Sequence, residues 1–231
     1  MLAKNTFNVV SILIVSYFII VLMELIAQFA TYRPVIFLAK ISAPILLVYL
    51  YHKSSVKQNP FFYVLISMLL FANILFFFRN PNYFFLASAI SIIQKMIMLL
   101  LVISMTTERR FARILLSAMP FLLMFYFLNS ITNENDGIEF NTIFFESVLV
   151  SFLGGISLAA YLKNDNRQHS WLLISTLLFT GLQFVVFIEK YYSFVVSLSV
   201  FSLIAVMLSG FGFFTFYKFL KSAEKRENYY L

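Results

Sequence analysis

The stretch that decides the fold runs from Phe61 to Met105 and reads FFYVLISMLLFANILFFFRNPNYFFLASAISIIQKMIMLLLVISM. It holds two apolar runs that are separated only by residues 79–82, Arg-Asn-Pro-Asn. Each run is close to the roughly 20 residues that a helix needs to cross the hydrocarbon core of a bilayer. Such a short polar turn leaves room only for a tight hairpin, so the stretch predicts two antiparallel transmembrane helices.

The whole chain shares the apolar character of this hairpin. Of its 231 residues, 61% are hydrophobic and only 12% are charged, and the mean hydropathy is +0.90. A soluble domain of this length could not cover so much apolar surface. The apolar runs are continuous and do not alternate with polar residues, which excludes an outer-membrane β-barrel. We therefore expect an all-α integral membrane protein in the inner (plasma) membrane of a bacterium.

Eight membrane spans can be placed along the chain by this criterion. They form a single predicted domain over residues 1–220, which a short cytoplasmic tail follows over residues 221–231. The predicted spans are residues 7–30, 34–51, 60–78, 82–104, 111–130, 140–162, 170–188 and 192–217.

Basic residues are distributed unequally between the two sides of these spans. Twelve of the 17 Lys and Arg residues fall in the two terminal tails and in the second, fourth and sixth loops, and three fall on the opposite side. The positive-inside rule therefore predicts that both termini lie in the cytoplasm. The net charge of +7 is a topology signal of this kind, so we expect no nucleic-acid partner.

Polar side chains occur inside six of the predicted spans. At the rise of a helix they all lie between the midplane and about 10 Å outside it. Intramembrane polar groups are costly and are candidates for a functional site. Two interpretations stay open: interhelical contacts worth about 0.5–2 kcal/mol each, or a shared polar pocket for a headgroup, an ion or a scissile bond. The residues are Glu24, Lys40, Asn73, Gln94, Lys95, Glu146 and Gln183.

The sequence offers little for metal or cofactor chemistry. It contains no cysteine, and its two histidines, His52 and His169, fall in predicted cytoplasmic loops. We expect both histidines to be solvated, so we predict no dedicated transition-metal site and no cofactor. The Walker loop, the GxSxG motif and the HExxH motif are absent.

The order of the intramembrane residues resembles the YhhN-type lysoplasmalogenase family of membrane proteins. As in that family, the second span carries a lysine followed by a proline, Lys40 and Pro44. The third span of the family carries Gly-Asp, which is followed by a short turn, aromatic residues and a histidine deep in the fourth span. The corresponding residues here are Ala-Asn at 72–73, Tyr-Phe at 83–84 and Lys95.

The seventh span continues the correspondence. The family pattern is Leu-Phe, two residues, Ser-Asp, and Lys-Phe seven residues on. This chain has Leu-Phe at 178–179, Leu-Gln at 182–183 and Lys-Tyr at 190–191. The eighth span departs from the pattern, because residues 210–214 read Gly-Phe-Gly-Phe-Phe where the family has Tyr-Tyr-x-Ala-Gln.

The resemblance implies that a lysoplasmalogen or another lysophospholipid is the partner, and that its vinyl ether is hydrolysed to an aldehyde and a glycerophospho-base. Both aspartates that the family implies as catalytic are amides here, Asn73 and Gln183, and an amide transfers no proton at neutral pH. Glu24 and Glu146 could replace them, because a carboxyl in a low-dielectric site can act as a general acid. Alternatively, Lys95 could act where the family uses histidine.

Three functional hypotheses follow from the sequence. The first is a lysolipid-binding protein of the lysoplasmalogenase type, with vinyl-ether hydrolysis as its reaction. The second is a non-catalytic lipid-binding or scaffolding protein. The third is a small transporter that uses the Glu/Lys layer as a relay.

Overall fold

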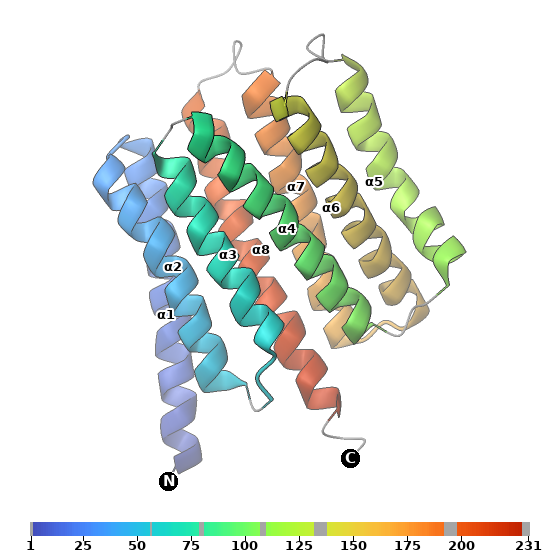
Figure 1. Cartoon of the computed structure of the whole chain (residues 1–231). Coiled ribbons are helices and arrows are strands. Elements are labelled where there is room, and N and C mark those ends of the chain that lie inside the picture. Colours follow the sequence, from blue (N-terminus) through green and yellow to red (C-terminus); the bar gives the residue numbers. More distant parts are fainter. Residues whose placement is uncertain are drawn as a thin grey trace.

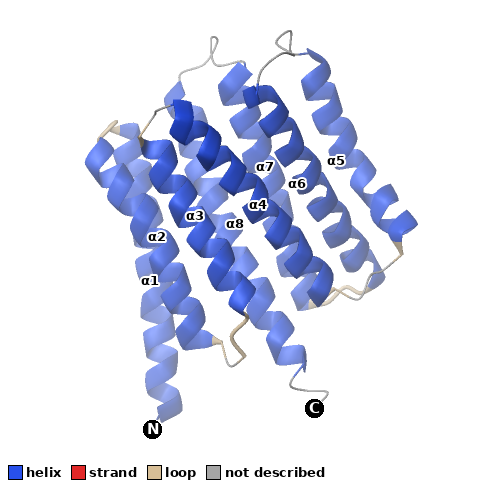
Figure 2. Ribbon diagram, viewed as in Figure 1, coloured by secondary structure: helices blue, strands red, loops and turns tan. Residues whose placement is uncertain are grey.

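The computed structural model describes residues 2–55, 57–78, 81–106, 110–131, 138–191 and 198–227. Within these ranges the chain is helical and has no strand (Figure 2). All eight helices contain a segment long and apolar enough to cross a membrane. This confirms the predicted all-α, eight-span fold of an integral membrane protein. The helices are α1 (Leu2–Phe29), α2 (Arg33–Ser54), α3 (Pro60–Phe77), α4 (Pro81–Met105), α5 (Phe111–Ile131), α6 (Ile138–Lys163), α7 (Arg167–Tyr191) and α8 (Leu198–Glu227).

Residues with special backbone preferences set the helix ends in the first half of the chain. The Oδ1 atom of Asn59 accepts a hydrogen bond from the backbone N–H of Phe61 at 3.0 Å, which caps α3. Pro60 is the first residue of that helix, a position where its missing N–H is harmless. Between α1 and α2, Thr31 has a φ of 55°, a left-handed conformation of the kind that ends helices.

Two details differ from the sequence-based expectation. Helix α8 continues to Glu227, past the predicted end at residue 217, because residues 218–227 contain no Gly or Pro and Leu220 is fully buried. His169 lies in the first turn of α7 and only 1% of it is exposed. Its Nδ1 atom lies 2.8 Å from the carbonyl oxygen of Asn164. The expectation of a solvated loop residue is therefore wrong for His169, whereas the side chain of His52, in the last turn of α2, is exposed.

Seven of the helices form a closed ring. In the order α1, α2, α3, α4, α6, α7 and α8, each helix packs against the next, and α8 packs against α1. Helix α5 lies outside the ring and packs on α6 (Figure 1). Helix α1 begins and α8 ends at the same end of the bundle (Figure 1). We call this end the termini end and the other the far end.

Small residues allow the closest helix contacts. A Cβ atom built on Gly155 of α6 would lie 2.5 Å from the Cβ atom and 2.8 Å from the backbone of Ala118 on α5. A Cβ atom built on Gly210 of α8 would lie 2.9 Å from the side chain of Val21 on α1. The carbonyl oxygen of Gly210 accepts a hydrogen bond from the Tyr17 hydroxyl at 2.8 Å. These contacts attach α5 to the ring and close the ring between α1 and α8.

The apolar core fills the ring toward the termini end. Helix α2 reaches across the ring there to contact α8. Ten side chains of this core are completely buried: Leu50, Tyr51, Phe62, Leu65, Val102, Leu172, Phe216, Tyr217, Phe219 and Leu220. The core leaves the far-end half of the ring to the cavity described next.

Candidate functional site

A cavity of about 780 Å³ lies inside the ring. All seven ring helices line it, and α5 contributes no residue. Each helix contributes residues from the half that leads to the far end, such as Gln28 near the end of α1 and Thr142 near the start of α6. We call this space the central cavity. Its lining includes every polar residue that the sequence placed in the intramembrane layer: Glu24, Lys40, Asn73, Gln94, Lys95, Glu146 and Gln183.

The floor of the central cavity is apolar. Several side chains belong both to the cavity lining and to the core cluster, and they separate the polar groups from the termini end. They are Tyr17, Val21, Ala43, Leu47, Met98, Leu153, Phe179 and Phe213. The cavity is therefore amphipathic, with apolar walls below a polar band, and its volume falls in the range of ordinary small-molecule sites.

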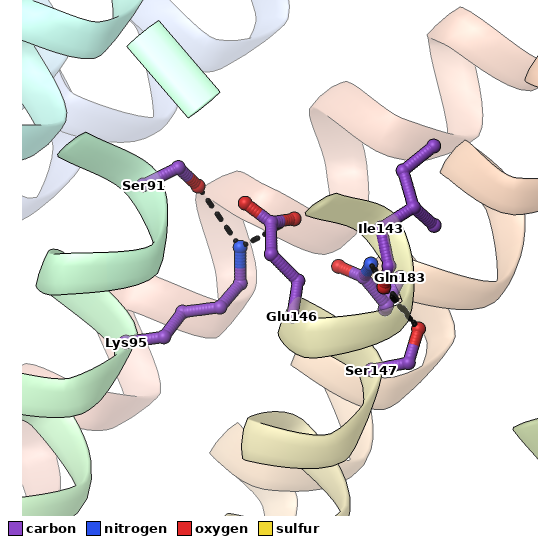
Figure 3. Close-up of polar contacts among 6 residues, drawn as sticks. All are labelled: Ser91, Lys95, Ile143, Glu146, Ser147 and Gln183. Atoms are coloured by element: carbon purple, nitrogen blue, oxygen red, sulfur yellow. Dashed lines mark hydrogen bonds and ion pairs between the residues drawn. The ribbon is translucent and has the colours of Figure 1, made fainter. Parts of the chain in front are cut away.

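One wall of the cavity carries an ion pair between α4 and α6. The Nζ atom of Lys95 lies 3.0 Å from Oε2 of Glu146 and donates a hydrogen bond to Oγ of Ser91 at 3.0 Å. Figure 3 shows the ammonium between the hydroxyl and the carboxylate. The side chains of Lys95 and Glu146 are 23% and 11% exposed. This pair is shielded from bulk water, so its electrostatic attraction is stronger than that of a surface pair.

A second charged group faces the same space from other helices. Lys40 of α2 acts electrostatically on the carboxylate of Glu24 on α1 and on that of Glu189 on α7. Glu24 is buried and Glu189 is half-buried. One cation thus interacts electrostatically with two carboxylates from different helices.

The amide side chains serve mainly to join neighbouring helices. Asn73 on α3 donates to the carbonyl oxygen of Lys40 on α2 at 3.2 Å. Gln94 on α4 donates to the carbonyl oxygen of Leu65 on α3 at 3.3 Å. Both amides thereby satisfy backbone carbonyls across a helix contact, as expected if the intramembrane polar residues make interhelical contacts.

Gln183 makes the corresponding link between α7 and α6. Its Nε2 atom donates to the carbonyl oxygen of Ile143 at 3.3 Å and to Oγ of Ser147 at 3.4 Å (Figure 3). Gln183 is only 3% exposed. Because Glu146 lies next to Ser147 on α6, this link also fixes the turn of helix that presents the carboxylate.

Glu189 and Ser91 are among the lining residues that the sequence analysis did not select. Glu189 lies next to Lys190 at the end of an apolar run, where a charged pair is usually a solvated helix end, so no signal distinguishes it. Ser91 stands four residues before Lys95, and residues at that spacing share a helix face. The spacing could have identified Ser91 once Lys95 was chosen.

The chemistry that this site can support is that of carboxylates, amines and hydroxyls. Among the residues that the structure describes, no group of three His, Cys, Asp or Glu side chains is arranged to hold a metal ion. In the described part of the chain, the charged lining residues are three acids, Glu24, Glu146 and Glu189, and three bases, Lys40, Lys95 and Lys190. Such a lining offers partners to both an anion and a cation of one ligand.

These features define the class of protein: a multi-pass α-helical membrane protein whose seven-helix ring encloses an amphipathic cavity. No family model, no curated protein and no solved structure matches the chain.

Proposed function

We propose that the protein binds a single-chain lysolipid in the central cavity. The observation that carries the proposal is that one space joins apolar walls to a band of charged side chains. An amphiphile with one chain and one charged headgroup matches both parts. A soluble polar metabolite would leave the apolar floor without a partner, and a plain hydrocarbon would place apolar groups against the charged side chains.

The charges of the polar band suit a phospholipid headgroup. Lys40 and Lys95 are cations that can bind a phosphate, and ammonium groups are common phosphate ligands in proteins. Glu24 and Glu189 are carboxylates that can bind an amine. Because acids and bases both line the cavity, a zwitterionic headgroup can gain a partner for each of its charges.

The resemblance to lysoplasmalogenases extends the proposal to vinyl-ether hydrolysis. That reaction adds a proton to the enol-ether carbon and water to the resulting oxocarbenium ion. The hemiacetal then separates into an aldehyde and a glycerophospho-base. Since Asn73 and Gln183 cannot transfer protons, this role falls to Glu24 and Glu146, two buried residues that line the cavity.

The expected topology predicts which side of the membrane the cavity faces. If the termini lie in the cytoplasm, as the basic residues indicate, the far end and the central cavity face the outer side of a bacterial plasma membrane. A lysolipid of the outer leaflet would then reach the cavity without crossing the midplane. The apolar core at the termini end favours this binding role over the transport of a solute through the ring.

Native mass spectrometry of the purified protein tests binding, and aldehyde release from a lysoplasmalogen tests hydrolysis. We expect co-purified lysolipid in the wild type and reduced retention in Lys40→Met. Aldehyde release above that of Glu146→Gln supports hydrolysis, whereas bound lipid without turnover supports the non-catalytic alternative.

Ser104→Ala, on the same helix as Lys95 but outside the cavity lining, is the control for nonspecific effects. A protein without bound lysolipid, which also fails to bind it when added, would contradict the proposal.

A further inference from the structure

Ser91, Lys95 and Glu146 stand in the order of a nucleophile, a base and the group that orients the base. The Lys95 Nζ atom lies 3.0 Å from the Ser91 Oγ atom and 3.0 Å from the Glu146 Oε2 atom. Figure 3 shows the three side chains converging from α4 and α6. A nucleophile within hydrogen-bond reach of a base that a third group holds is the recurrent arrangement of covalent catalysis.

We propose that Ser91 is the nucleophile of a serine–lysine hydrolase site that cleaves the carboxylic ester of a single-chain acyl lipid bound in the central cavity. The inference rests on the proposed lysolipid binding and adds a reaction to it. All three residues line the same cavity, so an ester bond placed at the polar band meets the hydroxyl directly.

The pair of Lys95 and Glu146 supplies the proton exchange that the hydroxyl needs. In the proposed reaction the proton of the ion pair moves to Glu146. The Lys95 amine, whose Nζ atom lies 3.0 Å from the Ser91 hydroxyl oxygen, then acts as the general base.

The reaction then balances in two steps. In the first, Ser91 Oγ bonds to the ester carbonyl carbon while its proton moves to Lys95 Nζ. The bond from that carbon to the alcohol oxygen breaks, and the alcohol leaves with the proton, so that Ser91 is acylated. In the second, water adds to the acyl carbon under the same base, and the Ser91 oxygen leaves with a proton as the carboxylic acid is released.

The charge on Lys95 assists both steps. Each step passes through a tetrahedral intermediate with a negative oxygen, formed when Lys95 has just gained a proton. The ammonium then lies beside the reacting atoms in a site with little water, where such a charge stabilises an oxyanion strongly. A vinyl ether has no carbonyl carbon for Ser91 to attack, so this reaction can cleave acyl lipids but not alkenyl lipids.

A long-chain alkyl fluorophosphonate, which phosphonylates activated serines, tests the nucleophile in the full-length protein. We expect label at Ser91, located by peptide mass spectrometry. The Ser91→Ala variant should carry at least about tenfold less label than the wild type. The Lys95→Met variant should react with the probe at least about 100-fold more slowly, which is the usual contribution of a general base. Ser104→Ala should label like the wild type. The site of labelling in the wild type is decisive even if a variant folds poorly: no label at Ser91 overturns the proposal.

Two esters identify the source of the acyl chain. Release of fatty acid from a 1-acyl lysophospholipid alone indicates that the phosphate takes part in recognition, and release from a monoacylglycerol as well indicates that the acyl chain suffices. A protein that retains lysolipid but is not labelled at Ser91 overturns the nucleophile and leaves lipid binding standing. Label at Ser91 without any lysolipid binding supports the nucleophile and overturns the lipid-binding proposal.

Discussion

Tyr51 on α2 donates its hydroxyl hydrogen to the carboxylate of Glu224 on α8, across the ring at the termini end. Ser55 donates to the other oxygen of the same carboxylate, and the Tyr51 oxygen in turn accepts from the backbone N–H of Asn59 at 2.9 Å. Next to this group, the hydroxyls of Ser54 and Tyr217 lie 2.7 Å apart. This network joins α2, the start of α3 and α8 beneath the apolar core, so it holds the closed end of the ring opposite the cavity.

Removing the Tyr51 hydroxyl should therefore loosen the termini end. The Tyr51→Phe variant leaves a buried carboxylate with one donor fewer, and we expect a loss of about 2 kcal/mol in the free energy of unfolding. Unfolding in mixed micelles measures the change. Tyr63→Phe is the matched control, since its hydroxyl bonds to Gln58 at an exposed site, and it should change stability by less than about 0.5 kcal/mol. Equal effects of the two variants would show that the network is not stabilising.

Removing only one partner of the Lys95–Glu146 pair should destabilise the protein more than removing both. Glu146→Gln leaves a shielded ammonium without its carboxylate, and we expect a loss of about 2–3 kcal/mol in the free energy of unfolding. The double variant Lys95→Met with Glu146→Leu removes both charges and should recover most of this loss. Unfolding of the single and double variants in the same micelles tests the coupling. Strictly additive losses would mean that the two side chains act independently.

Two glycine-to-alanine changes should have opposite signs. In Gly155→Ala the new methyl group meets the backbone of Ala118 at 2.8 Å, so α5 must move away from α6, at a cost of about 1–3 kcal/mol. In Gly181→Ala the nearest atom is a side-chain carbon of Leu208 at 3.5 Å, an ordinary contact. The helix preference of alanine should then stabilise this variant by about 0.5–1 kcal/mol. Thermal unfolding in one detergent compares the two, and a stable Gly155→Ala would contradict the tight α5–α6 contact.

The spans could be predicted from the sequence because the bilayer imposes one length and one polarity on every helix. The third helix begins at the predicted residue, Pro60, since Asn59 and Pro60 form a recognisable start. The end of α8 was harder to predict. Beyond Tyr217 the sequence becomes polar, which marks the end of an apolar run. Polarity alone does not stop a helix, and residues 218–227 contain no Gly or Pro.

The site illustrates what depth along a helix can and cannot reveal. Equal depth suggested that the intramembrane polar residues share one space, and all seven line the central cavity. Depth carries no information on which helices are neighbours, so the link of Gln183 to α6 and the place of α5 outside the ring could not be read from it. Glu189 was missed because it stands at the end of its span, where a charged residue is the norm.

Access to the cavity should depend on the side of the membrane. The chain has no cysteine, so a single cysteine can be placed at Gln28, in the cavity lining near the far end, or at Lys57, exposed at the termini end. We expect a membrane-impermeant maleimide to label Gln28→Cys in intact cells and Lys57→Cys only after permeabilisation.

A lysolipid should protect the cysteine at residue 28 and leave the one at residue 57 unaffected, because only the first lies in the proposed binding site. At saturating lysolipid we expect the maleimide to react with Gln28→Cys at least about threefold more slowly, because the lipid occupies the site most of the time. Labelling of Lys57→Cys from outside would reverse the topology. Equal rates with and without lysolipid at residue 28 would place the lipid elsewhere on the protein.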